Sequence, residues 1–283
     1  MRYRDVDEGE RISDEALLLS DQVDYAKFID RLHREEGIDL SQYKQNQLRR
    51  RLNSIIKQAG FSGYCRYLDH ARKDKATYRK FIDRITINVS EFLRNPEKFK
   101  ILEERYLKPL LKRKASPLIW SAGCSTGEEP YSIALLLEKL GAGGHVRVLG
   151  GDIDRGALAK AEEGIYQEKA LKNVPSEMVQ RYFSRVGERH YQVNEALKRR
   201  VRLERCNLLE DRFPQDADII LCRNVVIYFK DRAKRELYVR FGQALDKNGV
   251  LMIGSSESIF NADEAGLRVA ETFFYVRQDA EVS

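Results

Sequence analysis

The segment Trp120–Ser132, WSAGCSTGEEPYS, combines a glycine turn with two adjacent carboxylates, and a helical apolar pattern follows from Ile133. In nucleotide-binding proteins such a turn admits a phosphate to the N-terminus of a helix. Glu128 and Glu129 would repel a pyrophosphate at this place, whereas they would attract a positively charged ligand. The alternative is that they only interact with the positive end of the helix dipole, which applies more to Glu128 than to Glu129.

A third carboxylate follows the next apolar run, VRVLG, where Asp152 ends a predicted second strand. An acid at this position of a doubly wound sheet accepts hydrogen bonds from both ribose hydroxyls of an adenosine. Asp154 is expected to cap the next helix, RGALAKAEEG, and Asp152 could also be an ordinary loop residue. Adenosine together with positive charge indicates S-adenosylmethionine, whose sulfonium and ammonium groups are both cationic.

The elements that must position these acids alternate between short apolar runs and helical stretches. Strands interleaved with helices predict an α/β fold with a doubly wound, mostly parallel sheet of Rossmann-like type. A charged segment at about 164–200 interrupts the alternation and is expected to be a small inserted subdomain with a hairpin around Gly187. The predicted strands are Leu118–Ala122, Val146–Gly150, Val201–Glu204, Ile219–Cys222, Val250–Gly254 and Phe273–Val276.

Helical spacing of apolar residues predicts a small all-helical domain in the N-terminal part of the chain. Tyr25, Phe28 and Leu32 recur at helical intervals, Ser41 is expected to cap a second helix, and Gly60 is expected to end it. Two further helices are predicted over 64–73 and 76–88. The predicted division is a flexible N-terminal extension (1–20), a helical domain (21–95), a linker helix (96–115) and a cofactor-binding α/β domain (116–283) with the inserted subdomain.

Composition narrows the class of protein without deciding the partner. The net charge of +6 is as compatible with binding to an acidic protein surface as with binding to a nucleic acid. No run approaches the roughly 18 apolar residues of a membrane span, and the charged N-terminus is unlike a secretory signal. The four cysteines form no C-x-x-C pair, which argues against a zinc knuckle. A reduced, cytoplasmic setting and no metal are therefore expected.

Six segments of the chain resemble the chemotaxis receptor methyltransferases, the CheR family. The resemblance covers roughly residues 24–278 and implies an S-adenosylmethionine-binding domain preceded by a small helical domain. The segments are TINVSEFLRN (86–95), WSAGCSTGEEPYSIA (120–134), GGDIDRGALAKAEEGIY (150–166), CNLLEDRF (206–213), CRNVVIYF (222–229) and GVLMIGSSESIF (249–260).

The resemblance also implies which residues form the site. Arg94 and Tyr228 would be the catalytic residues by orienting the acceptor and the methyl group, although Tyr228 could simply be a core residue. Ser90 stands where some relatives have threonine. The implied cofactor-binding residues are Asn88, Ser90, Arg94, Glu129, Asp152, Asn207, Leu208, Arg223 and Asn224.

The reaction implied by the resemblance forms a methyl ester on a glutamate of a receptor helix and releases S-adenosyl-L-homocysteine. A glutamate with a pKa of about 4.3 is already ionised, so no general base is needed. The implied partner is an acidic, Glu- and Gln-rich receptor helix, approached by the basic helix around Arg49, Arg50 and Arg51, unless these are only a solvated helix face. Nucleic acid and membrane insertion are not expected, and the protein should be a monomer.

Three other functions remain as alternatives. Methylation of RNA or a small molecule is disfavoured because the segment CRNVVIYF lacks the prolines of base-methylating enzymes and no proline adjoins Cys222. A non-catalytic S-adenosylmethionine-binding receptor adaptor would not need Arg94, Asn224 and Tyr228 together. The acidic loop disfavours a nicotinamide oxidoreductase. Some members of the family that the chain resembles use a hairpin in the inserted segment to bind a short tether at the C-terminus of the receptor. The segment 184–197 looks shorter than in those relatives, so recognition without this tether is expected.

Overall fold

The computed structural model describes residues 22–86 and 90–280, and the extension predicted for residues 1–20 lies outside these ranges. The chain divides after Ile85 into two compact units, which are described separately.

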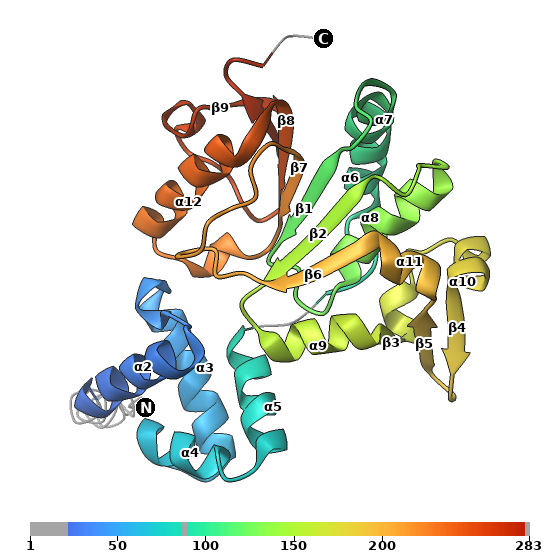
Figure 1. Cartoon of the computed structure of the whole chain (residues 1–283). Coiled ribbons are helices and arrows are strands. Elements are labelled where there is room, and N and C mark those ends of the chain that lie inside the picture. The colour runs from blue at the N-terminus through green and yellow to red at the C-terminus, as the bar shows by residue number, and fades with distance from the viewer. Residues whose placement is uncertain (1–21, 87–89, 281–283) are drawn as a thin grey trace, which may run out of the picture. The chain divides into compact units, whose positions relative to one another are not determined.

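The first unit is all-helical, as predicted, with its helices joined by short connections (Figure 1). Its interior is aromatic, because the ring of Phe28 contacts those of Tyr64 and Phe81, and Tyr67 packs edge-on against Phe81. The elements are α2 (Gln22–Glu36), a 3₁₀ turn η1 (Leu40–Gln42), α3 (Gln45–Gln58), α4 (Tyr64–Ala71) and α5 (Lys75–Thr86).

The prediction that Ser41 caps the second helix was wrong. Ser41 lies inside the 3₁₀ turn, and its own backbone N–H donates to the Asp39 side chain at 2.9 Å. Helix α3 starts four residues after Ser41 and follows Lys44, which provides no side-chain cap. The carboxylate of Asp39 caps the 3₁₀ turn instead, and Ser41 is taken up in that turn, before α3 begins.

The second unit is built on a seven-stranded sheet, and its first five strands are parallel neighbours. The doubly wound fold predicted from the sequence is confirmed, and the strand order reverses between β1 and β7. The last two strands were predicted only in part: β10 is antiparallel to both its neighbours, and the short edge strand β9 was missed. In spatial order the strands are β6 (Val201–Arg205), β2 (Arg147–Asp152), β1 (Leu118–Ala122), β7 (Ala217–Cys222), β8 (Leu245–Ile253), β10 (Phe274–Arg277) and β9 (Leu267–Glu271).

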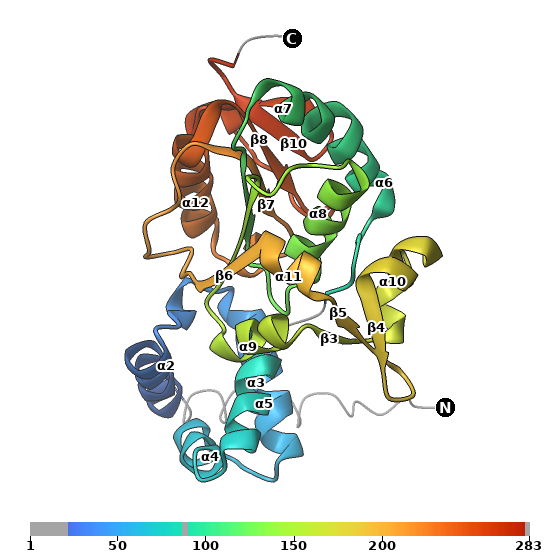
Figure 2. The same cartoon turned by 45° about the vertical axis from the view of Figure 1, so that its right-hand side comes forward.

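Helices cover both faces of this sheet. Figure 2 shows α6 (Pro96–Ile101), α7 (Lys108–Arg113) and α8 (Glu128–Lys139) on one side and α12 (Asp231–Ala244) on the other. A π-helical turn, Leu102–Leu107, joins α6 to α7. On the α12 side the rings of Trp120, Phe213 and Phe241 pack together, which buries the central strands. Helix α9 (Arg155–Glu163) follows β2, and α11 (Glu195–Arg200) precedes β6.

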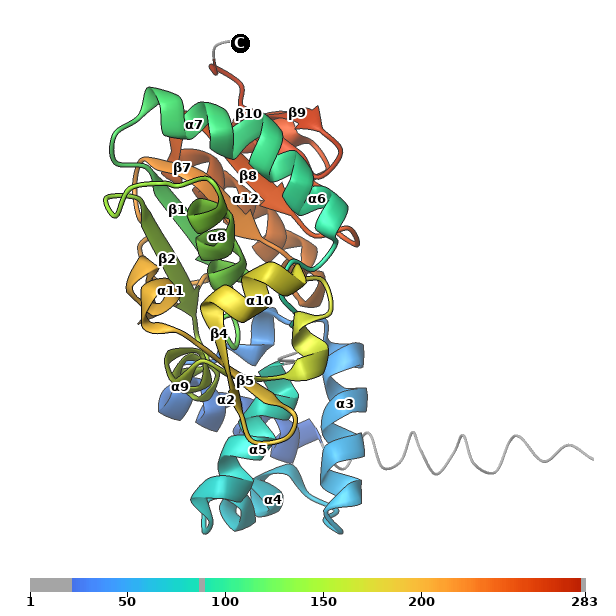
Figure 3. The same ribbon diagram turned by 90° about the vertical axis from the view of Figure 1, so that its right-hand side faces the viewer.

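A second, three-stranded sheet lies between α9 and α11 in the sequence (Figure 3). It contains the hairpin expected around Gly187, whose φ of +65° suits a glycine in the turn. Its residues join the core of the larger sheet, where Phe92 packs edge-on against Tyr166 and Phe183. The elements are β3 (Ile165–Gln167), η3 (Glu168–Leu171), α10 (Ser176–Tyr182), β4 (Phe183–Val186) and β5 (His190–Val193).

Two 3₁₀ turns complete the described elements, η4 (Val226–Tyr228) and η5 (Ala262–Ala265). Within the described ranges, every helix is too short or too polar to cross a membrane.

Candidate functional site

The glycine turn after β1 lies against the end of β2. The backbone N–H groups of Gly123 and Cys124 both donate to the carbonyl of Gly151, at 2.8 and 3.0 Å. Gly123 has a φ of +81°, and a Cβ atom there would lie 2.5 Å from a methyl group of Val225. The position therefore requires glycine for its backbone conformation and because the loop after β7 approaches it so closely.

Asp152, the predicted ribose acceptor, is buried at the end of β2. Its two carboxylate oxygens accept the backbone N–H groups of Ser125, at 2.7 Å, and Asp154, at 2.9 Å. Burial raises the pKa of Asp152 to about 6, because the charged form loses solvation. A carboxylate has about four acceptor sites, so Asp152 keeps capacity for ligand hydroxyls. The predicted cap is confirmed, since Asp154 accepts the N–H groups of Gly156 and Ala157.

The two adjacent glutamates of the turn have different surroundings. Glu128 accepts the hydroxyl of Thr126 at 2.6 Å, and burial raises its pKa. Glu129 accepts the hydroxyl of Ser121 at 2.8 Å and pairs with Arg223 at 3.2 Å. Glu129 is thus the member of the pair that contacts the loop after β7.

Arg223 is the centre of a buried polar cluster. Its side chain is only 3% exposed, and one guanidinium nitrogen donates to the carbonyl of Arg94, at 2.7 Å, and to the Oδ1 atom of Asn95, at 2.9 Å. Its Nε atom is buried without a hydrogen-bond partner among residues 22–86 and 90–280. A buried donor of this kind is unfavourable unless a ligand completes its hydrogen bonding, so the cluster is suited to bind an acceptor group.

The segment that carries Arg94 is fixed to two other elements. The N–H of Phe92 donates to the carbonyl of Ala170 at 3.0 Å, and that of Leu93 donates to the hydroxyl of Ser132 on α8 at 2.8 Å. These bonds hold the Arg94 backbone beside the Arg223–Glu129 pair. Ser90 is half-buried and hydrogen-bonds to Glu128.

Asn88, also predicted to bind the cofactor, lies outside the described residues.

Asn207 and Leu208 form a buried turn after β6. The backbone N–H of Cys206 donates to the carbonyl of Asp152 at 2.9 Å, which ties this turn to the end of β2. Arg240 on α12 donates to the carbonyl of Leu208. The predicted cofactor-binding pair Asn207–Leu208 and the predicted ribose acceptor Asp152 are therefore neighbours.

Asn224 and Tyr228 follow Arg223 in the loop after β7. Asn224 has a φ of +59°, an unusual conformation for a residue with a side chain, and it is half-buried. Tyr228 closes the 3₁₀ turn η4 and is also half-buried. Such a residue can present its hydroxyl to a ligand, and the catalytic role of Tyr228 stays a prediction.

Three partners of these residues were missed by the sequence analysis. Ser121 holds Glu129, Asn95 holds Arg223, and Glu257 accepts backbone N–H groups of the loop after β7. Ser121 and Asn95 lie within motifs that were recognised, so their polarity was a usable signal. Nothing in the pattern of GSSESIF distinguishes Glu257 from a surface glutamate.

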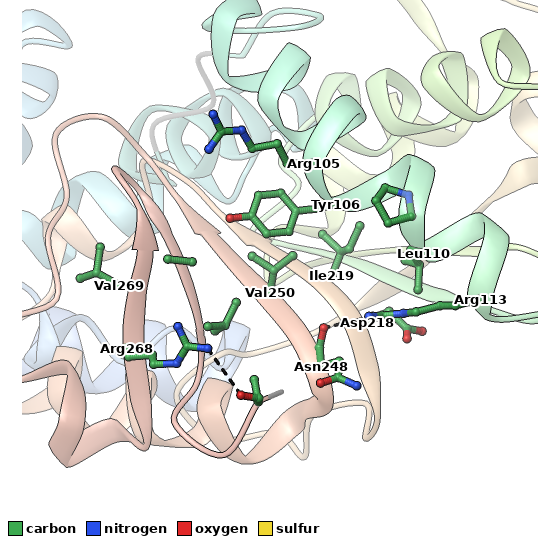
Figure 4. Close-up of a pocket in the computed structure, with 14 residues that line it drawn as sticks. Arg105, Tyr106, Leu110, Arg113, Asp218, Ile219, Asn248, Val250, Arg268 and Val269 are labelled. Carbon is green, nitrogen blue, oxygen red and sulfur yellow. Dashed lines mark hydrogen bonds between the residues drawn. The ribbon is translucent and has the colours of Figure 1, made fainter. Parts of the chain in front are cut away.

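A pocket of about 360 Å³ lies elsewhere in the second unit (Figure 4). It is formed by the π-helical turn, α7 and strands β7 to β10, with Tyr106 and Val250 among its lining residues. It includes Asp218 near the start of β7, whereas Arg223 follows the end of that strand. The described residues predicted for the site do not line this pocket.

Comparisons with known proteins define the class as a methyltransferase with an S-adenosylmethionine-binding domain. Residues 88–273 match the CheR methyltransferase SAM-binding domain, and residues 23–86 match the CheR methyltransferase all-alpha domain. The chain belongs to the CheR methyltransferase family.

Two curated relatives illustrate the similarity. The chemotaxis protein methyltransferase of Listeria monocytogenes is 36% identical over 255 residues, which cover 90% of this chain and 97% of that protein. The Escherichia coli chemotaxis protein methyltransferase is 32% identical over 274 residues and covers 94% of each chain. The resemblance stated from the sequence is thus confirmed.

Proposed function

We propose that this protein transfers the methyl group of S-adenosylmethionine to glutamate side chains of membrane chemotaxis receptors. The products are glutamyl methyl esters and S-adenosyl-L-homocysteine. The observation that carries the proposal is the buried Arg223 beside the glycine turn, which pairs with Glu129 and donates to the Arg94 carbonyl, and whose Nε atom has no partner among the residues that the structure describes. Relatives that span nearly the same length are named chemotaxis protein methyltransferases, which supports the choice of pathway.

The residues of the site fit the chemical groups of this cofactor. Asp152 offers carboxylate oxygens to the ribose hydroxyls, and Glu129 offers a negative charge to the ammonium group. The Nε atom of Arg223 is a suitable donor for the methionine carboxylate. When bound, the cofactor supplies an activated methyl group on a positively charged sulfur. The remaining proposed contacts are Asn88, Ser90, Arg94, Asn207, Leu208 and Asn224.

The protein's own contribution to the reaction is orientation and exclusion of water. The acceptor glutamate is already an anion at neutral pH, so no proton has to be removed. We assign Arg94 and Tyr228 to aligning the acceptor carboxylate with the methyl group. Charge disappears as the transition state forms, so Arg94 must hold the carboxylate weakly and the site must be poorly hydrated.

The proposed receptor-binding element is α3 in the helical unit. Its sequence, QNQLRRRLNSIIKQ, has no acidic residue, and Arg50 and Lys57 are exposed. Arg49 lies over the ring of Tyr25 at 4.1 Å, which fixes one arginine of the series. A basic helix attracts the acidic methylation helices of a receptor and increases the association rate. In this proposal the protein acts as a monomer in the cytoplasm.

Methyl-labelled cofactor, incubated with the protein and receptor-containing membranes, tests the proposal. The expected result is label on the receptor that mild base releases as methanol, because esters hydrolyse under these conditions. A receptor whose acceptor glutamates are replaced by alanine should remain unlabelled. Cofactor binding without label would indicate an adaptor instead, and base-stable label on RNA or on a small molecule would indicate another substrate.

A further inference from the structure

Glu257 follows β8 and is a buried carboxylate that the proposed reaction does not use. It is 7% exposed and accepts four backbone hydrogen bonds. Its Oε2 atom accepts the N–H groups of Gly254, at 2.6 Å, and Asn224, at 3.0 Å. Its Oε1 atom accepts those of Val225, at 3.0 Å, and Val226, at 3.1 Å. Three consecutive N–H groups of the loop after β7 therefore converge on one side chain.

This arrangement depends on the negative charge of Glu257. Consecutive backbone N–H groups that point to one place form an anion-binding concavity, which the carboxylate fills here. Burial raises the pKa of Glu257, while the four hydrogen bonds favour the ionised form. A glutamine at this position would have one acceptor oxygen, and its amide group would face two backbone donors. The charge and both oxygens are thus needed to hold all four N–H groups.

The loop held by Glu257 is the one that carries Asn224 and follows directly from Arg223. Asn224 has a φ of +59°, which a non-glycine residue keeps only when its surroundings enforce it. The backbone nitrogen of Asn224 would lie 2.8 Å from a Cβ atom at Gly254, so the loop after β7 packs closely against the segment after β8. On its other side the loop contacts the glycine turn through Val225 and Gly123. Glu257 therefore fixes the backbone between two parts of the candidate site.

We propose that Glu257 is a positioning residue for the methyl donor. Its ionised carboxylate holds the 224–226 backbone in the strained shape that presents Asn224 and Arg223 to the cofactor. The inference rests on the proposed function of the site. It assigns part of the cofactor affinity to a residue that makes no contact with the cofactor itself.

The test compares Glu257→Gln with Asp218→Asn in the full-length protein. Asp218, labelled in Figure 4, is a matched control, because it is also buried and accepts a backbone N–H, that of Leu118 at 2.8 Å. It lies near the start of β7, whereas Glu257 follows the end of the parallel strand β8. Calorimetric titration with S-adenosyl-L-homocysteine at pH 7.5 should give a Kd raised roughly tenfold for Glu257→Gln, since a charge-assisted hydrogen bond is lost. Asp218→Asn should keep the parent Kd. In receptor labelling, Glu257→Gln should raise the KM for the cofactor and leave that for the receptor unchanged.

Equal Kd values for Glu257→Gln and the parent would overturn the inference, and so would an equal loss of affinity in Asp218→Asn. If the parent binds no cofactor, the proposed function fails instead. Should Glu257→Gln not fold, hydrogen exchange of the parent decides. The Val225 and Val226 amides should be protected at neutral pH and should lose protection as acidification protonates Glu257. Unprotected Val225 and Val226 amides at neutral pH would contradict the proposal.

Discussion

Strand β7 has a buried charge near each end, and the two charges are satisfied differently. At the start, both oxygens of Asp218 are engaged, by Lys114 at 2.8 Å and by the backbone of Leu118 at 2.8 Å. After the end, Arg223 pairs with Glu129 but has an Nε atom without a partner in the described parts of the chain. The first charge serves folding. The second cluster retains hydrogen-bonding capacity, which fits the binding site that we propose there.

Arg223→Ala should have the largest effect, because it leaves the carboxylate of Glu129 buried without its cation. The expected cost is about 3 kcal/mol of unfolding free energy, together with a loss of cofactor affinity of about 100-fold or more. Urea unfolding and calorimetric titration measure the two effects separately.

Lys114→Met is the corresponding change at the start of β7. It should also lower the unfolding free energy, because Asp218 loses its cation, but the Kd for the cofactor should stay at the parent value. If Lys114→Met weakened cofactor binding as much as Arg223→Ala does, the distinction between the two ends of β7 would be wrong.

Asp152→Asn should weaken cofactor binding about 10- to 100-fold, since one charge-assisted acceptor is lost. The parent should also lose affinity as the pH falls below about 6, because Asp152 has a pKa of about 6 and its protonated form accepts fewer hydrogen bonds from ribose. Titrations from pH 8 to pH 5 should show this decrease in the parent and a flatter profile in Asp152→Asn. If Asp152→Asn lost affinity with falling pH as steeply as the parent does, Asp152 would not be a ligand of the cofactor.

Gly123→Ala should reduce cofactor affinity by about tenfold, because a Cβ atom would displace Val225 and the loop after β7. Gly141→Ala is the matched control, since Gly141 also has a positive φ, +65°, but has open space around its Cβ position. It should cost about 1 kcal/mol of unfolding free energy and leave binding unchanged. Equal Kd values for the two variants would show that the contact with Val225 is unimportant.

The double variant Arg50→Glu/Arg51→Glu should have the smallest effect. The KM for the receptor should rise about threefold to tenfold at low salt and less at high salt, since exposed charges are screened. The Kd for the cofactor should not change. Receptor-labelling kinetics at two salt concentrations test this prediction. If the double variant and the parent had the same KM for the receptor at low salt, α3 would not be the docking element.

The strands near the site were predictable because buried parallel strands are apolar throughout. The predicted run 118–122 coincides with β1, and the run 219–222 lies within β7. Strand β9, LRVAE, was missed because it lies at an edge, where Val269 and its neighbours are exposed and the apolar signal is weak. The start of α3 was misplaced because a 3₁₀ turn takes up Ser41, and α3 begins after Lys44, which has no capping side chain to mark it.

The charges of the site were predictable only where a local pattern explains them. Asp152 and Glu129 follow from strand ends and the glycine turn, and the remaining site residues came from the resemblance to the family. Glu257 was not predictable, because three of its four partners lie about thirty residues away and all four are backbone atoms with no side-chain signature. The side-chain contacts of Arg223 likewise join segments more than ninety residues apart.

Calorimetric titration with S-adenosyl-L-homocysteine at pH 7.5 tests the central claim most directly, with the parent, Asp152→Ala and Glu129→Ala measured side by side. The account predicts one binding site in the parent and affinities lowered at least tenfold in both variants. A parent protein that does not bind, or variants that bind as tightly as the parent, would contradict it.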